Sequence, residues 1–233
     1  MTNIFANNNL LEPLMMKDQV AGLIKEAMMS GQLQAGERIV ELRVAKQLGV
    51  GTTCVREALF ELEKQGFVAR IPNKGAYVTE FSKEDTEQIY RVRIALEGLA
   101  AELAQANTTP TELQEMQRCV DEMKEAAHAG DLDSFFENDL RFHREMWALS
   151  RNRVLVKLLE SLVTPLFAFY LMRTRRDVQQ LVRGAEKHQR ILDAIRTGDP
   201  GGSRKVVEET LQIFKGEEEV FLQNKSIEGS DKP

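Results

Sequence analysis

One stretch of the chain decides its fold: residues 40–59 read VELRVAKQLGVGTTCVREAL. Apolar residues recur at helical spacing in its first half, and this pattern stops at the Gly-Val-Gly of residues 49–51. The pattern resumes in a second helix, which Thr52 or Thr53 can cap at its start and which ends at Gly66. Two short helices around a glycine-containing turn predict a helix-turn-helix.

The flanking sequence extends this motif on both sides. Upstream, residues 15–29 have the apolar spacing of a helix. Downstream, the β-like runs FVARI at 67–71 and AYVT at 76–79 enclose PNKG at 72–75, which is a hairpin turn sequence. The sequence therefore predicts a winged helix-turn-helix over residues 1–80, with a small β-hairpin as the wing.

A winged helix-turn-helix binds DNA with the start of its third helix in the major groove, where side chains contact base edges and phosphates. Thr52, Thr53 and Arg56 occupy those positions, and a guanidinium such as that of Arg56 can bind guanine or a phosphate through two donors. At the wing tip, Lys74 can reach the DNA backbone or the minor groove, and Gly75 can approach closely because it has no side chain. These five residues are the predicted DNA contacts. The alternative is a three-helix module whose charges are only solvated.

The distribution of charge permits a DNA partner. The 233 residues carry a formal net charge of −5, but residues 1–80 hold nine Lys+Arg and nine Asp+Glu, so the excess acid lies behind them. An acidic C-terminal part is not expected to face DNA.

Composition also indicates the cellular compartment in which the protein is expected. With 42% hydrophobic and 29% charged residues, the chain is ordinary for a soluble protein. We identify no apolar run near the roughly 18 residues of a membrane span, and no secretory signal at the N-terminus. Cys54 and Cys119 do not form a ligand-spaced pair, which suits a reducing compartment. We therefore expect a cytoplasmic protein with no membrane partner.

The remaining sequence predicts an all-α antiparallel helical bundle over residues 81–224. Capping signatures start at Ser82 and Thr109, and we see no further strand pattern. We expect a kink or a local break at Pro165, and a frayed polar tail over residues 225–233. The apolar stripes define six helices, at residues 83–106, 110–129, 132–150, 153–172, 178–197 and 202–223. The predicted fold class is thus mainly α.

Two of the three histidines lie where a metal ion could be held. Asp139 and His143 are four residues apart, so they share one helix face, and His188 lies on a later helix with an inward-facing apolar stripe. One carboxylate and two imidazoles can bind a metal with positions left open for water or a ligand. The alternative is that these three residues are surface residues or hydrogen-bonded core residues.

Arg93 is a candidate anchor for the carboxylate of an effector. The alternative role for Arg93 is a salt bridge to Glu97.

The N-terminal segment resembles the GntR family of transcription regulators. In that family the third helix usually opens with Ser-Arg-Thr-Pro, where this chain has Gly51, Thr52, Thr53 and Cys54. Threonine in place of the usual arginine at position 52 implies a different operator sequence or a lower affinity. The resemblance rests on GERI at 36–39, AKQLGV at 45–50, VREAL at 55–59, GFV at 66–68 and NKGA at 73–76.

The C-terminal segment resembles the ligand-binding domain of the FadR subfamily, called FCD. Many FCD domains hold a divalent metal with one Asp and three His beneath a pocket for a small carboxylate. Asp139, His143 and His188 match three of those ligands, and the fourth position falls on Thr210, next to the effector pocket that the resemblance implies. The resemblance therefore implies a three-ligand site for a Zn, Ni or Mn class ion, completed by water or effector; the alternative is a metal-free polar pocket. It rests on YRVRIALE at 90–97, DLRFH at 139–143, SRN at 150–152 and EKHQRILDAI at 186–195.

Together these features predict a ligand-responsive transcription regulator. We expect a homodimer that binds a palindromic double-stranded operator, represses transcription and is released by a small organic acid. We do not expect an enzyme. Two alternatives remain: a metal-dependent, hydrolase-like helical bundle, and a DNA-binding scaffold with a vestigial sensor.

Overall fold

The computed structural model describes residues 12–173, 178–197 and 199–228. The chain divides into two compact units, one comprising residues 1–80 with 168–173 and the other comprising residues 81–167 with 174–233.

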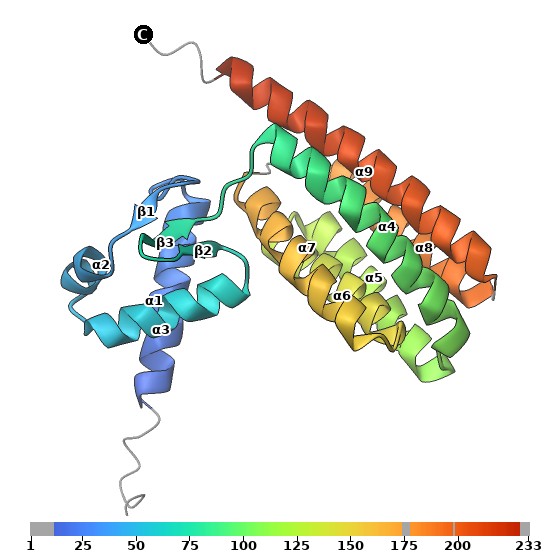
Figure 1. Ribbon diagram of the computed structural model, residues 1–233, viewed down its shortest axis with the longest axis horizontal. Helices are drawn as coiled ribbons and strands as arrows, with labels where there is room; N and C mark the ends of the chain where they lie inside the picture. Colours follow the sequence, from blue (N-terminus) through green and yellow to red (C-terminus); the bar gives the residue numbers. More distant parts are fainter. Residues whose placement is uncertain (1–11, 174–177, 198, 229–233) are drawn as a thin grey trace, which may run out of the picture. The chain divides into compact units, whose positions relative to one another are not determined.

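The first unit contains the predicted helix-turn-helix (Figure 1). Helix α1 (Glu12–Met29) packs against α3 (Thr52–Lys64), and α2 (Glu41–Leu48) also packs against α3. The inward stripe of α3 is fully or almost fully buried at Val55, Ala58, Leu59 and Leu62. This stripe explains why the third helix forms where the periodicity predicted it.

The connection between α2 and α3 depends on its glycines. Gly49 ends α2 in the left-handed region, with φ of 68°, where a side chain would be strained. The N-cap of α3 is Gly51, which makes no side-chain cap, so the prediction that Thr52 or Thr53 caps this helix is wrong. Both threonines instead lie in its first turn, and the helix ends at Lys64, before Gly66.

The wing is a three-stranded sheet. Strands β2 (Val68–Ile71) and β3 (Gly75–Val78) form the predicted antiparallel hairpin, and β1 (Arg38–Ile39) pairs with the other edge of β3. The order is therefore β1-β3-β2. Two residues are too few to show an alternating pattern, which is why the sequence did not predict β1.

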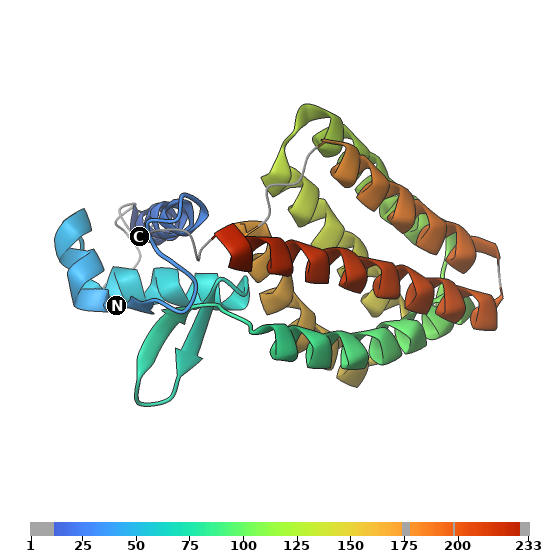
Figure 2. The same cartoon turned by 90° about the horizontal axis from the view of Figure 1, so that it is seen from above.

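The second unit is the predicted helical bundle, and Figure 2 shows its long helices from above. Helix α4 lies along α9, and α5 packs against both α6 and α8. Capping boxes at Ser82 and Thr109 start α4 and α5, as their sequence signatures predicted. The helices are α4 (Lys83–Asn107), α5 (Pro110–Ala129), α6 (Leu132–Leu149), α7 (Arg153–Arg173, whose residues 168–173 belong to the first unit), α8 (Val178–Thr197) and α9 (Pro200–Glu228).

The structure differs from two expectations about these helices. Helix α7 continues through Pro165, so the local break that was expected as the alternative to a kink does not occur; Leu159, Val163 and Leu166 around the proline are fully buried, and this packing holds the helix together. By length and composition, Arg153–Met172 of α7 could cross a membrane, but 56% of its most apolar 18-residue window is buried, as in a core helix. The charged Lys157 and Glu160 interrupt its apolar residues. Helix α9 extends to Glu228, because the first glycine or proline after its predicted end is Gly229; residues 229–233 lie outside the described residues.

Candidate nucleic-acid interface and metal centre

The candidate nucleic-acid interface lies at the start of α3. Thr53 and Arg56 are exposed there, and Thr52 is half-buried. Because Gly51 contributes no side-chain cap, the first-turn amides of α3 have no side-chain acceptor from the N-cap. Helix starts of this kind, with a positive dipole end, favour anions such as phosphate.

Arg56, the strongest of the predicted contacts, is bound to a carboxylate within the first unit. Its Nε and Nη2 donate to Oε2 of Glu41 on α2, at 3.1 and 2.9 Å. The side chain of Arg56 is still 59% exposed, so it remains accessible to a ligand. From β2, Arg70 donates to the Arg56 carbonyl at 3.3 Å and pairs with Glu63. The sequence offered no indication of the Glu41 contact, because the two residues are fifteen positions apart and lie on different helices.

The two wing residues have different surroundings. Lys74 is exposed, and its amide donates to the Ile71 carbonyl within the hairpin turn. Gly75 has φ of 108°, a conformation that other residues rarely adopt. A Cβ at Gly75 would also lie 3.7 Å from the guanidinium of Arg38 on β1. Glycine is thus required here by the backbone, and the basic residue beside it was not among the predicted contacts.

The candidate metal centre is in the core of the second unit. Asp139 and His143 on α6 and His188 on α8 bring one ligand atom each to within 4.8 Å of the others. His188 Nε2 lies 2.9 Å from Asp139 Oδ1 and 3.3 Å from His143 Nε2, and His143 Nε2 lies 3.5 Å from the same carboxylate oxygen. Both histidines are 1% exposed and Asp139 is 9% exposed. The structure therefore brings together all three residues that the sequence selected as ligands.

The outer nitrogens of the two histidines orient the cluster. His188 Nδ1 lies 2.8 Å from the Gly184 carbonyl, and His143 Nδ1 lies 2.7 Å from Oε2 of Glu97 on α4. The Gly184 carbonyl and the negative charge of Glu97 favour protons on both Nδ1 atoms, although the contact between His143 and Glu97 is not aligned as a hydrogen bond, so each Nε2 presents a lone pair to the centre. Asp139 Oδ1 is buried, and its short contacts are not aligned as hydrogen bonds. Three lone-pair-bearing atoms that face one another fit a divalent cation.

Arg93 on α4 makes the salt bridge to Glu97 that was one of its two predicted roles. The Nε–Oε1 distance is 2.7 Å, and both side chains are almost completely buried. Arg93 Nη2 also lies 3.4 Å from His143 Nε2, next to the candidate ligands. Burial alone would raise the pKa of Glu97, but Arg93 and then His143 lower it to about 2. Glu97 thus stays ionised and connects Arg93 to the metal centre, a role that the sequence did not reveal.

Thr210 lies fully buried on α9, and its hydroxyl has no hydrogen-bond partner in the described part of the chain. One turn later on α9, the ring of Phe214 packs 5.6 Å from that of His188. Among the described residues, the group of side chains that could hold a metal comprises Asp139, His143 and His188. Thr210 is therefore buried on the helix that contacts His188 but adds no His, Cys or carboxylate ligand to the group.

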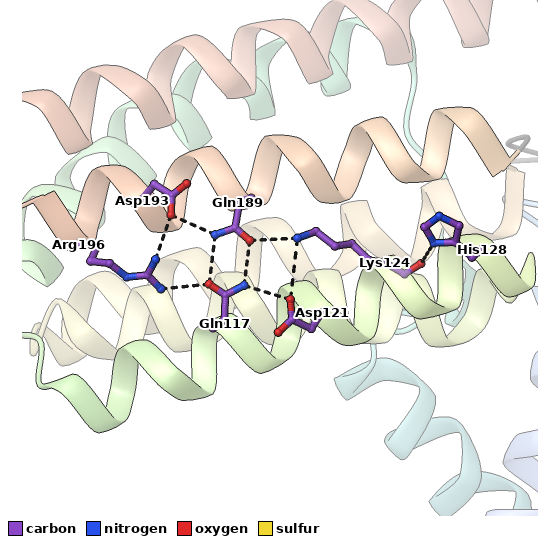
Figure 3. Close-up of polar contacts among 7 residues, drawn as sticks. All are labelled: Gln117, Asp121, Lys124, His128, Gln189, Asp193 and Arg196. Carbon is purple, nitrogen blue, oxygen red and sulfur yellow. Dashed lines mark hydrogen bonds and ion pairs between the residues drawn. The ribbon is translucent and has the colours of Figure 1, made fainter.

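Helix α8, which carries His188, is fixed to α5 by a network of polar side chains (Figure 3). Gln189, the next residue, exchanges two amide hydrogen bonds with Gln117 on α5, at 2.9 and 3.1 Å. Lys124 and Arg196 add donors to these same two amides. The third histidine, His128, is exposed on α5 and contacts only the Lys124 carbonyl in the view of Figure 3. The register of α8 on α5 is thus held next to the candidate ligand.

A winged helix-turn-helix joined to a helical domain with a buried, polar, ligand-competent cluster defines a class of protein: DNA-binding transcription regulators that carry a sensing domain. Comparisons with known proteins agree. Residues 16–78 match the model of the gntR family of bacterial regulatory proteins, and residues 88–212 match that of the FCD domain. The chain belongs to the GntR family, with an FCD domain behind its helix-turn-helix.

Individual relatives support this assignment. The chain is 27% identical over 195 residues to the HTH-type transcriptional regulator McbR of Escherichia coli K12, covering 83% of this chain and 88% of that one. It is 32% identical over 182 residues to a probable D-xylose utilization operon transcriptional repressor of Paenarthrobacter nicotinovorans, covering 78% and 79%. The solved structure of E. coli McbR/YncC is similar, with a TM-score of 0.68 and 26% identity over 90% of this chain and 98% of that one.

These findings confirm that the chain is a transcription regulator and not an enzyme, so the hydrolase-like alternative is set aside. Helix-turn-helix regulators of this family bind operator DNA, and the FCD domain indicates a small-molecule effector. FCD domains can also bind a metal.

Proposed function

We propose that the chain is a cytoplasmic homodimeric repressor, with no membrane partner, that releases its operator when a small carboxylate metabolite binds. Residues 1–80 bind DNA, and residues 81–224 bind the effector and form the dimer. The observation that carries this proposal is the buried cluster of Asp139, His143 and His188 beside the cation of Arg93, because a divalent cation held by this cluster would offer open positions to an anionic ligand.

DNA recognition is assigned to Thr52, Thr53 and Arg56 at the start of α3, with Lys74 and Gly75 on the wing. The exposure of Arg56 and the uncapped start of α3 support this assignment. A homodimer presents two such units to a palindrome whose half-sites are about 34 Å apart, or a multiple of that distance. Analytical ultracentrifugation with and without DNA tests the stoichiometry, and a monomer on DNA contradicts the dimer.

Selection from a random duplex library identifies the preferred DNA sequence. The variant Arg56→Ala then tests whether Arg56 recognises a base in that sequence. We expect Arg56→Ala to weaken binding to the selected duplex by about 1–3 kcal/mol, or about 5- to 150-fold, and to relax the preference at one position. Lys64→Ala is the control, because Lys64 is exposed at the other end of α3. Equal losses in the two variants, or no sequence preference in the wild type, overturn this assignment.

The metal is a divalent ion of the Zn, Ni or Mn class, held by Asp139, His143 and His188. When bound, it neutralises the buried carboxylate and offers open positions to an anionic effector or to water. Within the chain, Glu97 and the Gly184 carbonyl orient the two histidines, and Asp139 contributes the negative charge. Three ligands rather than four imply weaker binding than in relatives with the full set.

Metal removal and replacement test this site. At about 100 times the dissociation constant, a bound ion stabilises the fold by about 2.7 kcal/mol, so Zn²⁺ should raise the melting temperature of the metal-free protein by several degrees. His188→Ala should abolish this increase, and His128→Ala should preserve it because His128 is exposed elsewhere. The same increase in all three proteins contradicts the site and supports the metal-free pocket.

The effector is a small organic acid that contacts Arg93 and Thr210. Two buried polar atoms without partners in the described residues, the Thr210 hydroxyl and Trp147 Nε1, support a polar ligand nearby. A thermal-shift screen of small organic acids identifies it, and Thr210→Val then tests the contact, since valine keeps the shape without the hydroxyl. We expect weaker effector binding with little change in stability, because the hydroxyl makes no hydrogen bond in the described structure.

Release of DNA requires that the effector bind one arrangement of the dimer more tightly than the other. Addition of the effector should therefore lower the DNA affinity of the wild type. If no tested acid stabilises the protein or changes its DNA affinity, the vestigial-sensor alternative is supported.

A further inference from the structure

A hollow on the first unit brings four elements together. It is lined by Arg38 on β1, Glu41 at the start of α2, Thr52 and Arg56 on α3, and Gly75 at the start of β3. The helix-turn-helix and the wing therefore contribute to one continuous concave surface within the unit.

Arg38 is unusual among the basic residues of this surface because its charge is free. Its side chain is exposed and forms no ion pair or hydrogen bond with any residue that the structure describes. Arg56, the other arginine that lines the hollow, donates twice to Glu41. An exposed guanidinium without a carboxylate has five donors available for an external anion.

The position of Arg38 is fixed by the wing. Its backbone pairs with Tyr77 in the antiparallel register of β1 and β3, which places its guanidinium beside Gly75. The Nε and Nη2 atoms each lie 3.7 Å from the point where a Cβ of residue 75 would be. The guanidinium thus lies over the wing backbone on the side that borders the start of α3.

The charges that line the hollow favour an anion. Two guanidinium groups face one carboxylate, that of Glu41, and the start of α3 adds amides without a side-chain cap. Phosphate is the anion that arginine binds well through two donors, and a DNA-reading helix approaches a phosphate backbone on either side of the groove.

We propose that Arg38 binds a DNA backbone phosphate from β1 while α3 contacts the bases, so that the hollow is a phosphate subsite of the DNA interface. This inference rests on the proposed DNA interface and adds a residue outside the helix-turn-helix and the wing tip. A phosphate contact positions the protein on the duplex and is independent of base sequence.

The test uses a 30-base-pair duplex of random sequence, since a phosphate contact needs no operator. Binding is measured by fluorescence anisotropy over a range of salt concentrations for the full-length wild type, Arg38→Ala, Arg38→Lys and Lys64→Ala. Each phosphate contact that is lost reduces the slope of log affinity against log salt by about 0.9. We expect Arg38→Ala to reduce the slope by this amount for each protomer bound to DNA. Arg38→Lys should keep nearly the wild-type slope, and Lys64→Ala should keep the wild-type slope.

The outcomes separate this inference from the function on which it rests. If the wild type binds DNA but Arg38→Ala keeps the slope of Lys64→Ala, the phosphate contact is wrong and the DNA interface stands. If the wild type binds no duplex, the DNA-binding proposal itself fails. If Arg38→Ala and the wild type have equal urea midpoints, misfolding does not explain the change in slope. If Arg38→Ala has a lower midpoint, the salt slopes of Arg38→Lys and Arg38→Gln are compared instead, and the proposal requires these two slopes to differ. Equal slopes for those two variants overturn the proposal.

Discussion

Two arginine–glutamate pairs in this protein have similar geometry and opposite surroundings. In the first unit, Arg56 Nη2 lies 2.9 Å from Glu41, and the two side chains are 59% and 28% exposed. In the second unit, Arg93 Nε lies 2.7 Å from Glu97, and the side chains are 4% and 0% exposed. The contact distance is therefore no guide to what each pair does.

Burial explains the difference between the pairs. Arg56 is exposed to water, so the exchange of Glu41 for a DNA phosphate costs little free energy. This suits a residue that must release one partner to bind another. Arg93 and Glu97 have almost no water, and each is the compensating charge of the other. The exposed pair is suited to exchange, and the buried pair is suited to hold Glu97 against His143.

The largest expected effect separates the two pairs by stability. Arg93→Ala leaves the ionised Glu97 buried without its main partner, so we expect the free energy of unfolding to fall by about 3–5 kcal/mol. Arg56→Ala breaks the same kind of pair in water and should cost at most about 1 kcal/mol. Urea denaturation of both variants at pH 7 measures the difference, and similar losses would contradict the role given to burial.

Much of the fold could be predicted from the sequence because its signals are local. Gly49 interrupts the periodicity of the helix-turn-helix, and Ser82 and Thr109 carry capping boxes that the structure confirms. The errors occurred where tertiary packing or length decides the outcome. The core around Pro165 keeps α7 continuous, and β1 is too short to leave a pattern.

The candidate site was only partly predictable for the same reason. The spacing of Asp139 and His143 places them on one face of a helix, so the structure's clustering of these two with His188 was expected. The partners that orient the site come from elements distant in sequence: Glu97 is 46 positions from His143. No local pattern indicates such a contact, nor the free charge of Arg38 beside Gly75.

A smaller effect tests whether Glu41 competes with DNA for Arg56. Glu41→Gln removes a negative charge from the hollow and weakens the hold on Arg56, so we expect affinity for a random duplex to rise by up to about fivefold, the equivalent of the 0.2–1 kcal/mol of an exposed pair. Glu61→Gln is the control, since Glu61 pairs with Lys64 at the far end of α3. Weaker binding by Glu41→Gln would show that Glu41 positions Arg56 for DNA and does not compete with it.

The smallest effect concerns a third pair, which is exposed but has additional partners. Glu112 accepts from Arg151 at 2.6 Å and from the Thr109 amide in the capping box of α5. The Arg151 contact, and then those of Thr109, lower the pKa of Glu112 from 4.5 to about 2. Because the folded state has the lower pKa, the stabilisation is fully present above about pH 5 and is lost as the pH falls from there toward 2.

Glu112→Gln tests this pH dependence. The variant should be less stable than the wild type at pH 6, and the difference in free energy of unfolding between them should shrink as the pH falls to 3.5. Urea denaturation at several pH values measures the difference, with Glu115→Gln as the control, because Glu115 is on the same helix outside the cap. If the difference in free energy of unfolding between Glu112→Gln and the wild type does not change with pH, the charge of Glu112 contributes nothing to stability. The pair of Glu112 and Arg151 would then be as weak as the exposed pair of Arg56 and Glu41, despite its additional partners.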